Sequence, residues 1–128
     1  MVDFSIGDRE LDVMAVLWER GSGTVTEVRE RLPADLAYTT VLTILRNLEA
    51  KRFVRREGEG RAHRYFPVVA QDAASQHAVR RVIDKLFRGS PELLLSHLVE
   101  QQAMSAEELK GIRRRLKARL REQRDTEP

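Results

Sequence analysis

The chain has 128 residues, enough for one domain or two small ones, and its 41% hydrophobic and 5% aromatic content supports a modest, mostly aliphatic core. The absence of cysteine excludes disulfides and thiolate metal sites. The sequence contains no signal peptide and no apolar run of membrane-spanning length, so we expect a cytoplasmic protein without a membrane partner.

The net charge of +3 is unevenly distributed along the chain. Residues 1–45 hold four Lys/Arg against eight Asp/Glu, whereas residues 46–64 hold seven against three. A local positive surface attracts phosphate even where the total charge is small. The charge pattern therefore favours a nucleic-acid contact centred on residues 46–64.

Two short helices are predicted first. Apolar residues at helical spacing predict a helix over residues 7–20, which the sequence Gly21-Ser22-Gly23 ends. Trp18 lies on its apolar stripe and is expected in the core rather than at a ligand. Thr24 and Glu27 form the Ser/Thr-x-x-Glu pattern of a capping box, which predicts the start of a second helix at residue 25.

A third helix is predicted over residues 37–51. Its apolar face carries Val41, Ile44, Leu45 and Leu48. The opposite face has small hydroxyl groups and a forked cation but no carboxylate near its centre, as a helix entering a DNA major groove requires. The alternative is an ordinary amphipathic helix with a solvated polar side. Because it follows the second helix closely, the pair is typical of a helix-turn-helix motif, with this helix as the recognition helix.

A β-hairpin is predicted next, with strands over residues 53–56 and 62–66 and a turn at Gly58-Glu59-Gly60. Three helices followed by a hairpin define a winged helix-turn-helix domain, and we place it at residues 1–69. Basic side chains on the hairpin could hold DNA phosphates, or could simply protect a solvated sheet edge. The hairpin carries Arg55, Arg56, Arg61, His63 and Arg64.

Residues 70–128 are predicted to form a three-helix dimerisation domain, which makes the fold mainly α with a small β-hairpin wing. Its helices carry more apolar surface than such a small unit can bury alone, and a symmetric dimer buries the same surface twice. The predicted dimerisation residues are Val79, Val82, Ile83, Leu86, Leu94, Leu95, Leu98, Leu109, Ile112 and Leu116.

Catalytic and metal-binding patterns are missing from the sequence. His63, His77 and His97 have no partners at metal-ligand spacing, and the glycine clusters lack the Lys-Ser/Thr of a phosphate loop. We therefore expect no enzyme activity, no metal and no cofactor.

Several segments together resemble the penicillinase-repressor family, which includes the β-lactamase and methicillin-resistance repressors. The resemblance implies a winged-helix transcriptional repressor that binds palindromic operators as a homodimer, at β-lactamase or related resistance or stress genes. The segments that carry it are Gly7–Trp18, Thr24–Val28, Ala37–Leu45, Lys51–Val54, Gly60–Tyr65 and Ser105–Leu109.

Matching positions with the family implies specific DNA contacts. In the recognition helix they fall on Tyr38, Thr39, Thr40, Thr43, Arg46 and Asn47, and in the wing on Arg61 and Arg64. The staphylococcal branch responds to a membrane sensor protease through cleavage of an Asn-Phe bond. His97-Leu98 stands at that place here, which argues against induction by cleavage there, and the missing cysteines argue against the copper-sensing route of another branch.

Two other functions remain open on sequence alone. The arginines and leucines could serve a dimeric protein-interaction module with an acidic partner. The same scaffold could also activate transcription, because sequence does not reveal the sign of regulation.

Overall fold

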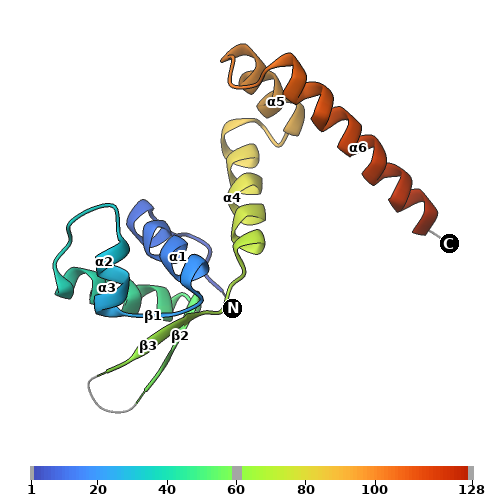
Figure 1. Ribbon diagram of the computed structural model, residues 1–128. Helices are drawn as coiled ribbons and strands as arrows, with labels where there is room; N and C mark the ends of the chain where they lie inside the picture. Colours follow the sequence, from blue (N-terminus) through green and yellow to red (C-terminus); the bar gives the residue numbers. More distant parts are fainter. Residues whose placement is uncertain (1, 59–61, 127–128) are drawn as a thin grey trace. The chain divides into compact units, whose positions relative to one another are not determined.

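The computed structural model describes residues 2–58 and 62–126 and contains mostly helices, with a small antiparallel sheet (Figure 1). This confirms the predicted fold class. The elements in chain order are α1 (Asp8–Arg20), β1 (Gly23–Thr24), α2 (Val25–Arg31), α3 (Tyr38–Ala50), β2 (Val54–Glu57), β3 (Arg64–Pro67), α4 (Gln71–Leu86), α5 (Pro91–Glu100) and α6 (Ala106–Thr126).

The chain divides into two compact units, Met1–Arg80 and Arg81–Pro128. Helix α4 contributes residues to both units. The division of the chain at residue 69/70 into a DNA-binding and a dimerisation domain stays a functional prediction.

The ends of α1 are set by local chemistry, as predicted. The Gly7 N–H donates to the Glu10 side chain at 3.1 Å, which satisfies a donor at the start of the helix. Gly21 ends the helix with φ of 91°, a left-handed conformation that glycine adopts without a steric penalty. Its N–H donates to the Leu17 carbonyl at 2.7 Å.

The predicted capping box at the start of α2 is confirmed. The Glu27 N–H donates to the Thr24 hydroxyl at 3.2 Å, and the Thr24 N–H donates to the Glu27 carboxylate at 3.2 Å. Both bonds satisfy backbone donors that the first turn of a helix leaves without intrahelical partners.

Replacing Thr24 by alanine is expected to lower the free energy of unfolding by about 1 kcal/mol, because the substitution removes the N-cap oxygen. For a unit of this size the melting temperature should fall by about 4–8 °C in calorimetry. Thr26→Ala, at an exposed position two residues later, is the matched control and should change the melting temperature much less. Equal losses in the two variants would contradict the capping account.

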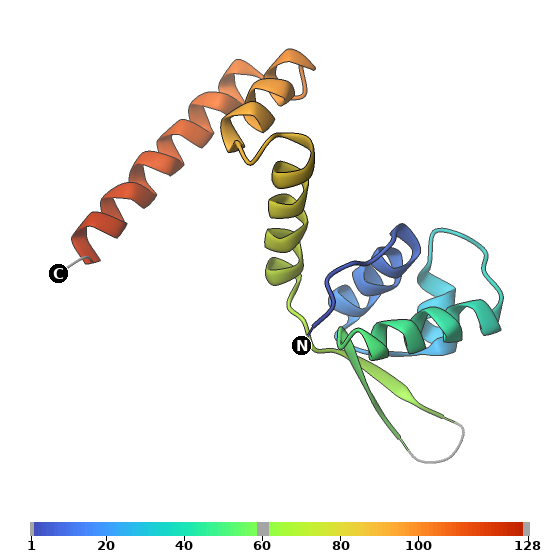
Figure 2. The same cartoon turned by 180° about the vertical axis from the view of Figure 1, so that it is seen from behind.

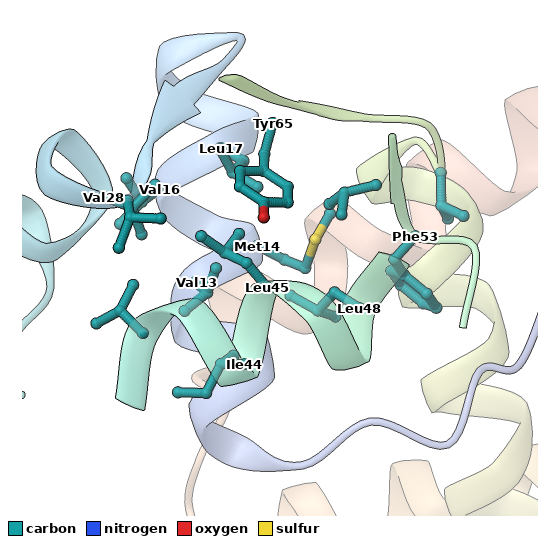
Figure 3. Packing of buried hydrophobic residues seen from close by; sticks show 14 residues of the cluster. Val13, Met14, Val16, Leu17, Val28, Ile44, Leu45, Leu48, Phe53 and Tyr65 are labelled. Atoms are coloured by element: carbon teal, nitrogen blue, oxygen red, sulfur yellow. The ribbon is translucent and has the colours of Figure 1, made fainter. Parts of the chain in front are cut away.

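One aliphatic cluster forms the core of the first unit (Figure 3). The four predicted inward residues of α3, Val41, Ile44, Leu45 and Leu48, are all buried there against Val13, Met14 and Leu17 of α1, Val28 of α2, Phe53 and Tyr65. Trp18 is half-buried at its margin, and its indole N–H donates to the Val69 carbonyl at 2.8 Å. The expectation that Trp18 serves packing is therefore confirmed.

The wing is a three-stranded sheet in the order β1-β3-β2, not the predicted two-stranded hairpin. The extra strand pairs Gly23 with Tyr65 and Thr24 with Arg64. At two residues β1 is too short to leave a period-2 signature. The pairing joins β3 of the wing to the segment between α1 and α2, and Figure 2 shows β2 and β3 extending away from the helices.

The starts of the last two helices also follow their predicted signals. The Leu93 N–H donates to the Ser90 hydroxyl at 3.2 Å with Pro91 in the first turn of α5, and the Glu108 N–H donates to the Ser105 hydroxyl at 3.1 Å before α6. Of the described residues from 81 onward, only Ile83 is buried. This second unit therefore has no core of its own comparable with that of the first.

Candidate nucleic-acid interface

The residues predicted to contact DNA from α3 share one accessible face. Tyr38, at the first position of the helix, is 45% exposed, and the rest of the set is exposed as well. The set is Tyr38, Thr39, Thr40, Thr43, Arg46 and Asn47. Because the inward residues of α3 are buried in the core, the first unit fixes which side of the helix faces outward.

The polar groups on this face are donors and acceptors suited to DNA. The Thr43 hydroxyl donates to the Thr39 carbonyl at 2.9 Å, so its lone pairs remain at the surface. Within the described ranges, Arg46 forms no ion pair. Glu49, the one acid on α3, lies 3.5 Å from the Arg56 guanidinium of β2 and is thereby partly neutralised.

Two wing arginines on β2 are exposed beside α3. The Arg55 guanidinium lies over the ring of Phe66, 4.4 Å from the ring centroid, and forms an ion pair with Glu57. Stacking on an aromatic face leaves guanidinium N–H groups at the ring edge available for phosphate. Arg61, the first predicted wing contact, lies outside the described residues.

Arg64, the second predicted wing contact, is held within the protein. Its guanidinium donates to the Glu27 carboxylate at 2.6 Å and to the Ser22 hydroxyl at 3.0 Å. Arg20 of α1 forms an ion pair with the other oxygen of Glu27. If Arg64 also contacts DNA, its guanidinium N–H groups must serve both the DNA and this internal cluster. The main effect of the cluster is to join α1, α2 and the wing strand β3.

Sequence reasoning missed the linking role of Glu27. The capping box indicated its bond to Thr24, but its two arginine partners lie 7 and 37 residues away. The backbone N–H of Thr24 is the largest cause that holds the pKa of Glu27 below its ordinary value of 4.5, and the hydroxyl of Thr24, Arg64 and Arg20 act in the same direction. A lowered pKa means that the folded state favours the charged carboxylate.

Replacing Glu27 by glutamine is therefore expected to lower the melting temperature at pH 7. The ionised carboxylate stabilises the folded state above pH 4.5, and this contribution is lost as the pH falls through the lowered pKa of the folded state. The difference in melting temperature between wild type and Glu27→Gln should shrink when calorimetry is carried from pH 7 to pH 3. A difference that stays constant over this range would contradict the assignment.

The C-terminal helices expose half of the predicted dimerisation residues. Val79, Val82, Leu86, Leu95 and Leu116 are exposed, with Leu86 at 73%, and Leu94, Leu98, Leu109 and Ile112 are half-buried. Ile83 is 6% exposed, so its side chain is already buried within the single chain. Three further leucine and valine side chains outside the predicted set are also exposed, namely Leu93, Val99 and Leu120.

The described residues offer neither a metal site nor a membrane span. No group of three or more His, Asp or Glu side chains there could hold a metal ion. No helix there combines the length and apolar character needed to cross a bilayer.

A helix-turn-helix with an accessible polar recognition face, followed by a basic β-hairpin, defines a winged-helix DNA-binding protein. The family profile described as penicillinase repressor matches residues 6–118. The chain belongs to the penicillinase repressor family, whose members are transcriptional regulators rather than enzymes.

Three similar proteins support this placement. The transcriptional regulator BlaI of Mycobacterium tuberculosis is 40% identical over 118 residues, which cover 87% of this chain and 82% of that protein. The methicillin resistance regulatory protein MecI of Mammaliicoccus sciuri is 21% identical over 112 residues, covering 86% and 91%. The solution structure of the DNA-binding domain of the repressor BlaI covers 57% of this chain and 93% of that domain, with 30% identity and a TM-score of 0.51.

Proposed function

We propose that this protein is a transcriptional repressor that binds palindromic operator DNA as a homodimer. The observation that carries the proposal is the face of α3, where hydroxyls, Asn47 and an arginine without a carboxylate partner in the described chain stand clear of the core. A helix is held in the major groove by such groups, which reach base edges and phosphates. Acting on DNA would place the protein in the cytoplasm.

Each group has a proposed role. Arg46 is suited to a bidentate contact with a guanine, Asn47 to an adenine edge, and the threonines and Tyr38 to phosphates or thymine methyl groups. On the wing, Arg55 and Arg56 would bind phosphates beside the groove, together with Arg61 as the family resemblance implies. Arg64 would act through Glu27, by holding the wing strand, as well as on DNA.

Homodimer formation is supported by the second unit. Most of its leucine and valine side chains are exposed, and of its described residues only Ile83 is buried. Exposed apolar surface of this kind marks a protein interface. Pairing two copies would bury the same surface twice and present two α3 helices to one operator.

The proposal is tested by fluorescence anisotropy with duplex DNA from upstream of the gene, against a scrambled duplex of equal length. A repressor dimer should prefer the upstream palindrome and lose affinity steeply as salt rises, because phosphate contacts release counterions. Sedimentation as a monomer with no affinity for either duplex would instead support the interaction module. A reporter assay with and without the gene decides between repression and activation.

The inducing signal is a separate question. The His97-Leu98 bond lies inside α5, and the ring of His97 packs edge-on against Phe87 with centroids 5.7 Å apart. Proteolytic nicking favours exposed loop tips over helices. Release of DNA by cleavage at this bond is therefore not part of our proposal.

A further inference from the structure

The first residues of the chain pack against the core of the first unit, although they belong to no helix or strand. Val2, Phe4 and Ile6 are half-buried there, whereas the two residues between them are exposed. Such alternation is typical of an extended segment that lies on an apolar surface. We call residues 2–6 the N-terminal strap.

The strap is attached to the end of α3. The Asp3 N–H donates to the Lys51 carbonyl at 3.1 Å, and the Lys51 ammonium donates to the Ser5 carbonyl at 2.6 Å. The ring of Phe4 meets the ring of Phe53 edge-on, with their centroids 5.5 Å apart. These contacts give the strap a defined position relative to the recognition helix.

Helix α4 meets the strap at His77. The rings of Phe4 and His77 stack with their centroids 3.7 Å apart and their planes at 6°. Of the α4 residues up to Arg80, Ala73 and Ala74 are half-buried and the others are exposed. In the described part of the chain, no other helix or strand packs extensively against α4. Beyond the first turn of α4, the stack is therefore a main contact that holds the helix to the first unit.

The opposite side of α4 carries predicted dimerisation residues. At 3.6 residues per turn, Val79, Val82 and Leu86 lie about 140–200° around the helix from His77. All three side chains are exposed. Helix α4 thus has one side that contacts the strap and an opposite apolar side that is available to a second copy of the chain.

We propose that the strap sets the spacing between the two half-sites that a dimer recognises, with Phe4 and His77 as positioning residues. This inference rests on the proposed function, because it requires two copies that pair in part through the apolar side of α4. The stack holds each α4 at one angle to its own α3. When the stack is removed, α4 turns about the link at residues 68–70, and the two recognition helices lose their fixed separation.

The first test measures the attachment of α4 without DNA. The chain has no cysteine, so Glu19→Cys and Gln76→Cys place single spin labels at exposed positions of α1 and α4 in the full chain, diluted with unlabelled protein. Electron–electron resonance should give a narrow distance distribution. His77→Ala should widen it about twofold because the stacking contact is lost, whereas His77→Phe keeps a ring and should not. Equal widths in all three proteins would overturn the proposal.

The fold should survive these changes. His77 is exposed, and alanine favours helices more than histidine does. Phe4→Ala, which removes the other ring, should widen the distribution to a similar extent, and the double variant should add little because both changes remove the same contact. Additive effects of the two substitutions would mean that each acts through other contacts, and would contradict the role of the stack.

The second test uses anisotropy with the upstream operator duplex, the same duplex with two base pairs inserted at its dyad, and a single half-site. The insertion turns one half-site by about 70° and moves it by about 7 Å. Wild type and His77→Phe should bind the lengthened operator about tenfold more weakly than the original, and His77→Ala only about threefold more weakly. All three should bind the single half-site equally, because none of the proposed DNA contacts is changed.

The outcomes separate the spacing role from other roles. An equal penalty for the insertion in wild type and His77→Ala would overturn the spacing role. Weaker binding of His77→Ala to the single half-site would mean that His77 supports the first unit in general, and would also overturn it. If wild type does not prefer the palindrome to the single half-site, the proposed function fails, while the resonance measurement still decides whether the strap holds α4.

Discussion

If the chain forms the dimer that we propose, replacing Leu116 and Leu120 together by aspartate is expected to convert it into a 14.8 kDa monomer and to abolish tight operator binding. Both side chains are more than half exposed and lie one turn apart on α6. Two carboxylates there would have to be buried in a dimer interface without partners, which costs more than the lost apolar contacts. The single chain should keep its helical circular dichroism because neither leucine is buried in it.

The loss of operator affinity in this double variant should be at least about 100-fold, because linking two half-site contacts multiplies their strength through effective concentration. Arg114→Asp is the matched control. At 3.6 residues per turn, position 114 is rotated by about 160° from Leu116 and about 120° from Leu120 around α6, so this variant should remain dimeric. Sedimentation equilibrium and anisotropy measure the two effects. A double variant that stays dimeric would place the interface elsewhere.

Replacing Arg46 by alanine is expected to weaken operator binding about 5- to 150-fold, the range for losing one bidentate base contact. Arg46 is exposed on α3, and its guanidinium forms no ion pair with a carboxylate in the described part of the protein. Since a base contact carries sequence information, affinity for scrambled DNA should fall much less than affinity for the operator. The variant should thus lose specificity as well as affinity.

The control for Arg46→Ala is Arg9→Ala, which removes an equal charge from the exposed surface of α1, where Arg9 pairs with Asp12 at 3.4 Å. It should alter operator binding little. Anisotropy titrations on both duplexes at one salt concentration distinguish the roles. If Arg46→Ala weakened operator and scrambled duplex equally, the side chain would contact phosphate only.

Local signals in the sequence predicted much of the first unit. The spacing of Val41, Ile44 and Leu48 fixed the buried side of α3, and the Thr24/Glu27 capping box fixed the start of α2. Both features depend on interactions within one or two turns of a helix. The residues that interact are therefore close in the sequence, and a local sequence pattern is enough to predict them. The same holds for the helix starts at Ser90 and Ser105.

Features that depend on distant residues could not be predicted in this way. Strand β1 exists because Gly23 and Thr24 meet β3 some forty residues later, and the bond between Glu27 and Arg64 spans 37 residues. The family resemblance suggested Arg64 as a DNA contact, but could not show that its guanidinium is engaged within the chain. The hydroxyl of Tyr65, which has no hydrogen-bond partner among the residues that the structure describes, leaves no trace in the sequence pattern, since a buried tyrosine on a strand is ordinary.

Hydroxyl-radical footprinting of the DNA upstream of the gene tests the central claim most directly. A dimer that places two α3 helices in the major groove should protect two segments related by a dyad, on one face of the duplex and separated by about one helical turn or a whole multiple of it. Arg46→Ala should weaken both segments together. Protection of a single half-site, or two segments on opposite faces of the duplex, would contradict the account.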